Sequence, residues 1–168
     1  MEFPKILLDK ISHYLKARKE SIASAESVTS GYLQLAFSQM LEAEKIYKGG
    51  ITAYTLEQKV KHLKVNPEEA LEMNCVSRNI CETMAANAGQ LFDAEWSVAT
   101  TGYATPVPES DQQIFAYYSI AHRGTIIRSD RIELHAMTKP LDAQRYYTEY
   151  ILGCLACELQ RNPEQINH

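Results

Sequence analysis

The residues that could do chemistry are a group of hydroxyl side chains, one lysine and several glycines. No G-x-G-x-x-G, P-loop, H-E-x-x-H or zinc-spaced pair of C-x-x-C motifs occurs in the sequence. Ser27 lies in AESVTSG, between a short segment of small residues and a segment with helical periodicity. At such a strand-to-helix turn, backbone N–H groups can stabilise negative charge, and a serine is either a nucleophile or an ordinary helix cap. The pattern alone favours the cap.

Two further residue groups have both a chemical and a structural interpretation. Tyr54 ends a β-rich segment and Lys59 follows it in a predicted helix, so by pattern alone they are a strand aromatic and a solvated lysine. Cys154 and Cys157 form a C-x-x-C in an apolar, helix-like stretch, which favours buried thiols over redox or metal chemistry. The histidines stand apart without ligand spacing, and we expect no metal site.

Three blocks of this sequence resemble the CinA C-terminal domain family, the nicotinamide-nucleotide amidohydrolases. AESVTSG is similar to the family's A-E-S-C-T-G-G turn, and KGGITAYTLEQKVKHLKV to its G-G-x-x-x-Y-S-N-E-x-K-x-x-x-L-x-V segment. CVSRNICETMAANAGQLFDAEWSVATTGYA is similar to a family helix followed by a strand and a glycine-rich loop. The blocks keep their order and spacing, so the resemblance runs from Ser21 to the last predicted helix.

This resemblance implies hydrolysis of the carboxamide of nicotinamide mononucleotide to nicotinate mononucleotide and ammonia. Ser27 matches the family's proposed nucleophile, Tyr54 its tyrosine and Lys59 its lysine. A lysine accepts a serine proton only when it is neutral, so its pKa must fall from ~10.4. Tyr54 would relay that proton or orient the hydroxyl. The resemblance also implies a homo-oligomer, and we expect no cofactor.

Residues that bind the substrate are expected in the turn after Ser27, in the third block and near the last helix. They are Thr29, Ser30, Gly31, Gly102, Tyr103 and Arg145. Backbone N–H groups from Thr29 to Gly31 are expected to hold an oxyanion. Arg145 or Lys139 would stand in for a family arginine that has no clear equivalent.

The sequence departs from the family where a phosphate would bind. Ser30 replaces a glycine, and GYATPVPESDQQ replaces a glycine-rich loop, so proline and larger side chains stand where bare N–H donors are expected. Three outcomes stay open: a nicotinamide-nucleotide amidohydrolase with a remodelled phosphate site, a hydrolase of another amide, or a homologue that binds a ligand or partner without turnover. An open pocket at Ser27 would favour an enzyme, whereas Tyr103 or Pro106–Pro108 filling it would favour a binding protein.

The elements that must position these residues alternate between helix and strand. We expect helices over 6–15, 31–41, Leu56–Val65, from Asn66-Pro67, over Val76–Phe92, and over Leu141–Leu159 before Asn162-Pro163; strands are expected over 21–27, 46–54 and 94–104, with a hairpin of Ile114–His122 and Thr125–Leu134. This pattern predicts an α/β fold, a single-domain three-layer α/β/α sandwich with a mixed sheet spanning residues 1–168.

Length and charge exclude several classes of function. The chain has 168 residues, 45% of them hydrophobic, with a net charge of -4. The lack of a positive field argues against nucleic acid as a partner. No apolar run is long enough for a membrane helix, and the charged N-terminal segment predicts a cytoplasmic location. The resemblance to the family implies a small-molecule nucleotide substrate as the partner.

Overall fold

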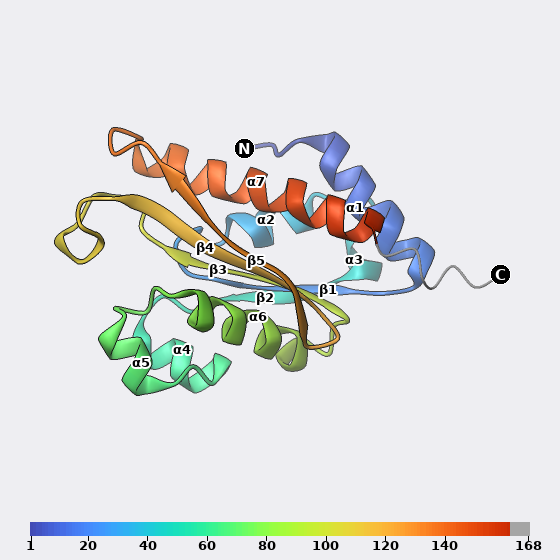
Figure 1. Ribbon diagram of the computed structural model, residues 1–168. Coiled ribbons are helices and arrows are strands. Elements are labelled where there is room, and N and C mark those ends of the chain that lie inside the picture. Colours follow the sequence, from blue (N-terminus) through green and yellow to red (C-terminus); the bar gives the residue numbers. More distant parts are fainter. Residues whose placement is uncertain (162–168) are drawn as a thin grey trace.

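The computed structural model describes residues 1–161, in which a five-stranded sheet lies between two layers of helices (Figure 1). The strand order is β2 (Tyr47–Thr52), β1 (Ile22–Glu26), β3 (Trp96–Gly102), β4 (Ile114–His122) and β5 (Thr125–Leu134). Strands β2, β1 and β3 run parallel, and β4 and β5 add to them as an antiparallel hairpin. The predicted α/β sandwich with a mixed sheet is confirmed.

Each face of the sheet has its own set of helices (Figure 1). One face carries α1 (Lys5–Arg18), α2 (Tyr32–Ser38), α3 (Ala43–Ile46) and α7 (Pro140–Arg161). The other carries α4 (Leu56–Leu63), α5 (Pro67–Glu72) and α6 (Arg78–Phe92). Every residue of β1 is buried, as expected for a strand covered on both faces.

The two hydrophobic cores differ in the size of their side chains. The core under α1 and α7 contains large residues, among them Trp96, Tyr147 and Leu155. The core under α6 is built mostly from alanines, with Leu63 and Met84 as its larger members. Small residues on β1, β3 and α6 let the helix approach the sheet closely, which fixes the strand ends that carry the site.

The chain path opens a crevice at the carboxyl ends of β1 and β3. The β1–β2 connection runs through α2 and α3 on one face, whereas the β2–β3 connection runs through α4, α5 and α6 on the other. Strand β1 lies between β2 and β3, so the first connection moves from β1 to one side of the sheet and the second returns past β1 to its other side. Open α/β sheets bind ligands at such a switch point.

The element boundaries differ from the predictions in a few places. Strand β2 ends at Thr52, before Tyr54, and α2 ends at Ser38. The short helix α3 and the one-turn 3₁₀ helix η1 (Pro108–Ser110) were not predicted, because segments of three or four residues carry too little periodicity. Asn162-Pro163, the expected end of the last helix, lies outside the described residues.

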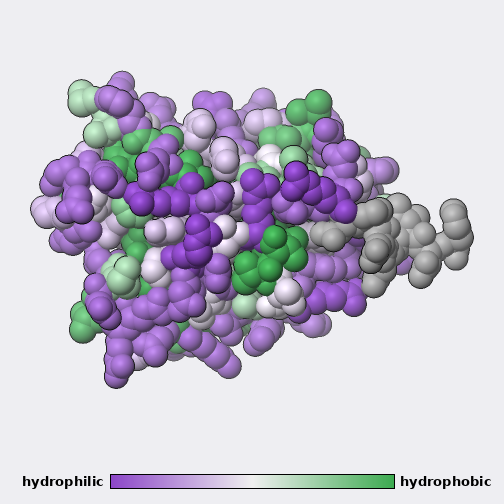
Figure 2. All heavy atoms as spheres, in the orientation of Figure 1, coloured by the Kyte–Doolittle hydropathy of each residue, from purple (hydrophilic) through white to green (hydrophobic). Residues whose placement is uncertain are grey.

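The surface is mainly hydrophilic on the face drawn in Figure 2, where hydrophobic residues form small, separate groups. Within residues 1–161, every helix is too short or too polar to cross a bilayer. Cys154 is buried as predicted, but Cys157 is exposed, so the prediction of a buried C-x-x-C pair is wrong for its second thiol. Burial raises the pKa of the Cys154 thiol.

A buried carboxylate, Glu20, ties the start of β1 to β3 and β4. It accepts hydrogen bonds from Trp96 Nε1 at 2.6 Å, from His122 Nε2 at 3.0 Å and from the exposed Arg123 at 3.3 Å. Burial raises the pKa of Glu20, but these hydrogen bonds outweigh it and leave the pKa below its ordinary value. The ionised carboxylate therefore stabilises the fold.

We expect Glu20→Ala to lower the free energy of unfolding by about 1–3 kcal/mol, because it leaves the buried Trp96 N–H without an acceptor. Glu20→Gln, which keeps an acceptor oxygen, should lose less. Since the pKa of Glu20 is lowered on folding, its contribution is present above its unfolded pKa and disappears as the pH falls through the folded pKa. Urea unfolding at neutral and acidic pH measures this. If the difference in the free energy of unfolding between wild type and Glu20→Ala were the same at both pH values, the stabilising role of the ionised Glu20 carboxylate would be contradicted.

Candidate active site

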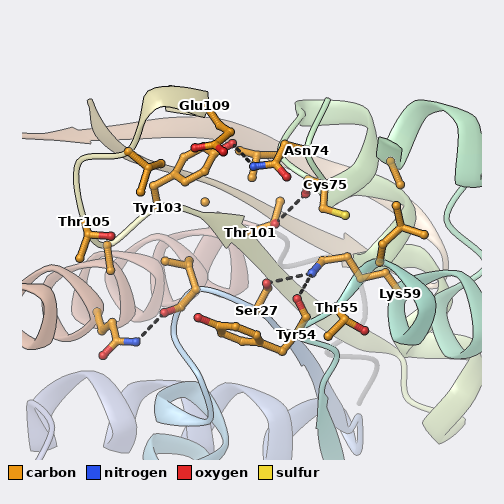
Figure 3. Close-up of a pocket in the computed structure, with 18 of the residues that line it drawn as sticks. Ser27, Tyr54, Thr55, Lys59, Asn74, Cys75, Thr101, Tyr103, Thr105 and Glu109 are labelled. Atoms are coloured by element: carbon orange, nitrogen blue, oxygen red, sulfur yellow. Dashed lines mark hydrogen bonds between the residues drawn. The ribbon is translucent and has the colours of Figure 1, made fainter. Parts of the chain in front are cut away.

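A cavity of about 670 Å³ opens at the carboxyl ends of β1 and β3 (Figure 3). Its walls come from the turns after these strands, from α4, from the segment joining α5 to α6 and from the start of α7. Its lining residues include Ser27, Val28, Tyr54, Lys59, Asn74, Cys75, Gly102, Tyr103, Thr105, Val107, Glu109, Pro140 and Gln144. The structure therefore brings the three blocks of the sequence together at one pocket.

Ser27 and Lys59 are in direct contact in this pocket. Lys59 Nζ lies 2.9 Å from Ser27 Oγ although the two residues are 32 positions apart in sequence. Ser27 follows β1 directly, and its backbone N–H donates to the carbonyl of Thr100 on β3, which holds the turn against the sheet. A serine hydroxyl and an amine at this distance can exchange a proton.

Lys59 is one of the most buried side chains of the protein, with 1% of its surface exposed. Its amine also lies 2.9 Å from the carbonyl oxygen of Ala53 and 3.0 Å from that of Tyr54. No carboxylate is among these partners, and burial lowers the pKa of Lys59 below its ordinary value. The interpretation of Lys59 as a solvated helix residue is therefore wrong, and the site favours the neutral amine that a general base requires.

Tyr54 contacts Lys59 through its backbone rather than its hydroxyl. Its side chain is 68% exposed and lines the pocket beside Ser27 (Figure 3). Within residues 1–161 the Tyr54 hydroxyl has no hydrogen bond to Ser27 or Lys59, so a direct proton relay through it is not formed in this structure. The Tyr54 side chain therefore forms part of the pocket wall.

The turn after Ser27 is organised by Glu26, a buried residue that the sequence analysis did not single out. Its carboxylate accepts hydrogen bonds from the Thr29 hydroxyl at 2.6 Å and from the backbone N–H groups of Gly31, Leu33 and Gln34 at 3.1, 3.0 and 2.8 Å. These are the first N–H groups of α2, which otherwise lack partners. Glu26 therefore caps the helix from inside the protein.

This arrangement corrects the expected oxyanion site. The N–H of Ser30 donates to the carbonyl of Ser27, and that of Gly31 to Glu26, so neither is free to hold a substrate oxygen. Within residues 1–161, the N–H groups of Val28 and Thr29 make no hydrogen bond and are the donors left in the turn. Ser30 keeps the left-handed backbone of the family glycine, at φ 50°, despite its Cβ.

The other predicted substrate-binding residues divide into two groups. Gly102 and Tyr103 line the pocket, whereas Thr29, Ser30 and Gly31 do not: Thr29 is buried, and Ser30 is exposed outside the lining. Arg145 is also outside the lining and forms an ion pair with Glu149 at 2.7 Å, so the structure does not bring it to the pocket.

Gln144, next to Arg145 on α7, lines the pocket instead. Its Nε2 donates to the carbonyl of Val28 at 2.9 Å and so holds the turn that carries Ser27. Asn74 and Cys75 form another part of the wall, each with a left-handed backbone at φ 47° and 62°. Asn74 donates to the Tyr103 hydroxyl at 3.1 Å. The sequence signals none of these, since their role depends on long-range packing.

The comparisons with known proteins agree with this structure. Residues 5–136 match the CinA C-terminal domain family. A CinA-like protein of Picosynechococcus is 28% identical over 88% of this chain, and one of Prochlorococcus marinus is 32% identical over 84%. The chain spans 35% and 33% of the lengths of these two relatives.

Solved structures share the fold across most of the chain. A CinA superfamily protein from Klebsiella pneumoniae has a TM-score of 0.82 at 22% identity, covering 94% of this chain and 98% of that one. A competence/damage inducible protein from Agrobacterium tumefaciens has a TM-score of 0.80 at 21% identity, with 95% and 99% coverage. The fold, the order of the sequence blocks and the match over residues 5–136 lead to one conclusion: this chain belongs to the CinA C-terminal domain family.

Proposed function

We propose that this protein is a serine amidohydrolase that cleaves the carboxamide of a small molecule bound in the pocket. The observation that carries this proposal is the 2.9 Å contact between Ser27 Oγ and the amine of Lys59. This amine is buried, and none of its hydrogen-bond partners is a carboxylate. The family resemblance implies nicotinamide mononucleotide as the substrate. The geometry of the pocket supports hydrolysis of an amide more strongly than it supports binding of the phosphate group of that substrate.

In the first step, neutral Lys59 accepts the proton of the Ser27 hydroxyl while Oγ forms a bond to the carboxamide carbon. Val28 lines the pocket next to Ser27 and its N–H makes no hydrogen bond within residues 1–161, so we assign the developing oxyanion to this donor. The protonated Lys59 then gives its proton to the leaving nitrogen as the C–N bond breaks, which releases ammonia.

In the second step, water attacks the ester carbon and gives its proton to Lys59. The C–O bond to Ser27 breaks, and the proton returns to Oγ as the acid leaves. The carbonyl oxygens of Ala53 and Tyr54 accept hydrogen bonds from the amine and hold Nζ beside Oγ. Gln144 acts as a positioning residue through the carbonyl of Val28.

The pocket itself supports an enzyme over a homologue that only binds. Tyr103 and Val107 lie on the wall, and the cavity of about 670 Å³ remains open between them and Ser27 (Figure 3). The loop that replaces the family's glycines does not fill the site. A cavity of this size holds a small molecule, which fits the expected class of partner.

The pH dependence of ammonia release tests this mechanism. The neutral fraction of Lys59 rises with pH, so kcat/KM should rise with pH through the pKa of Lys59 and then level off. Because burial lowers that pKa, the midpoint should fall below ~10.4, the ordinary lysine value. A kcat/KM that falls as the pH is raised from about 7 to 9 would contradict a neutral lysine base.

A further inference from the structure

The charges around the pocket do not suit a phosphate group. Lys59 is the basic residue and Glu109 the acidic residue among those that line it. The Lys59 amine already contacts three oxygens, those of Ser27, Ala53 and Tyr54, and in the proposed mechanism it is neutral before the reaction. A phosphate would therefore find no uncommitted cation in the lining.

The N-terminal end of α2, which points toward the site, is already neutralised. Glu26 places a buried carboxylate on the N–H groups of Gly31, Leu33 and Gln34. A phosphate at this helix end would have to displace an internal anion that is fully shielded from water. The glutamate is part of the A-E-S turn shared with the family, so the features that set this pocket apart lie in the loop after β3.

The loop after β3 offers fewer backbone donors than a glycine-rich loop, because only Ala104 and Thr105 among its pocket residues up to Val107 keep an N–H without a partner in the described part of the chain. Pro106 and Pro108 have no N–H, and the N–H groups of Tyr103, Val107 and Ser110 donate to Phe115, Ser110 and Val107. The same loop brings Glu109 to the pocket, where Figure 3 shows it beside Tyr103, across the cavity from Lys59. A carboxylate at this place repels a phosphate dianion.

The basic side chains near the pocket, Arg145 and Lys139, do not supply a binding group for a phosphate. Arg145 is paired with Glu149 outside the pocket. Lys139 precedes Pro140, which lines the pocket, but its own side chain does not.

We infer that the substrate of this site is a carboxamide without a phosphate group. The inference rests on the proposed function and narrows its substrate class. A neutral or positively charged group fits the end of the pocket away from Lys59, because the Glu109 carboxylate and the ring of Tyr103 lie there. The departures from the family's glycine-rich loop are then the determinants of this specificity.

A matched pair of amides tests the inference: nicotinamide riboside and nicotinamide mononucleotide, which differ only in the phosphate. We expect kcat/KM for ammonia release to be about tenfold or more higher for the riboside, a ratio equal to ~1.4 kcal/mol. Glu109→Lys should shift the ratio toward the mononucleotide by at least about tenfold. Glu2→Lys, which makes the same change in net charge at the exposed N-terminus, should leave the ratio unchanged.

Binding separates this inference from the proposed reaction. Ser27→Ala cannot form the ester, so the dissociation constants of the two compounds for this variant report specificity alone. Tighter binding of the riboside supports the inference even if wild type hydrolyses neither compound, a result that would contradict only the amidohydrolase. Equal or tighter binding of the mononucleotide, or binding of neither compound at millimolar concentration, would overturn it.

Discussion

Replacing Lys59 by methionine should lower kcat/KM for ammonia release by about 10²–10⁴-fold, the usual contribution of a general base. Methionine has a similar length and no amine, so Ser27 would keep its hydroxyl but lose the group that accepts its proton at 2.9 Å. The loss should appear mainly in kcat, since Lys59 lies under the nucleophile rather than on the open wall of the pocket.

Lys59→Arg is the control that separates a base from a fixed positive charge. Arginine stays protonated at any working pH and can donate hydrogen bonds, but it cannot take the serine proton. Under the proposed mechanism Lys59→Arg should be as inactive as Lys59→Met, with both variants folded by circular dichroism. Recovery of activity in Lys59→Arg would contradict the neutral base and assign Lys59 an electrostatic role.

Replacing Glu26 by alanine should lower the free energy of unfolding by about 3 kcal/mol or more, because it leaves several buried donors without an acceptor. The side chain is fully buried and accepts from the Thr29 hydroxyl and from three backbone N–H groups of α2. A loss of this size is a large share of a typical stability of about 5–15 kcal/mol. Urea denaturation of wild type and variant measures it.

Glu26→Gln is the matched variant for this prediction. Three of the four hydrogen bonds go to one carboxylate oxygen, Oε2, and the Gln34 N–H donates to the other, Oε1. An amide oxygen in the place of Oε2 would keep three bonds and lose the fourth, so Glu26→Gln should be more stable than Glu26→Ala. A Glu26→Ala variant within about 0.5 kcal/mol of wild type would show that water replaces the carboxylate in the turn.

Most of the fold follows from residue patterns. The alternation of helices and strands, the Arg123-Gly124 turn between β4 and β5 and the long final helix each carry a signal spread over many residues. Such signals predict element types and the layered architecture. Elements of three or four residues, such as α3 and η1, carry no comparable signal and were missed.

The site was predictable only in part, and the prediction came from motifs shared with the family rather than from residue periodicity. Matching motifs named Ser27 and Lys59, and the structure brings their side chains together at 2.9 Å. The sequence did not reveal that two of the N–H groups expected to hold an oxyanion are already used, that of Gly31 by Glu26 and that of Ser30 by the Ser27 carbonyl. It also offered Arg145 or Lys139 in place of a family arginine, whereas the structure puts Gln144 in the pocket wall. Neighbouring residues of a helix point about 100° apart, so Gln144 and Arg145 face different surroundings.

Ammonia release by wild-type protein and by Ser27→Ala, with nicotinamide riboside and nicotinamide mononucleotide as substrates, tests the central claim most directly. The account predicts release by wild type and a loss of about 10⁴-fold or more in the variant, since the hydroxyl that forms the covalent ester is gone. Release by Ser27→Ala at the wild-type rate, or no release by folded wild type from either amide, would contradict it.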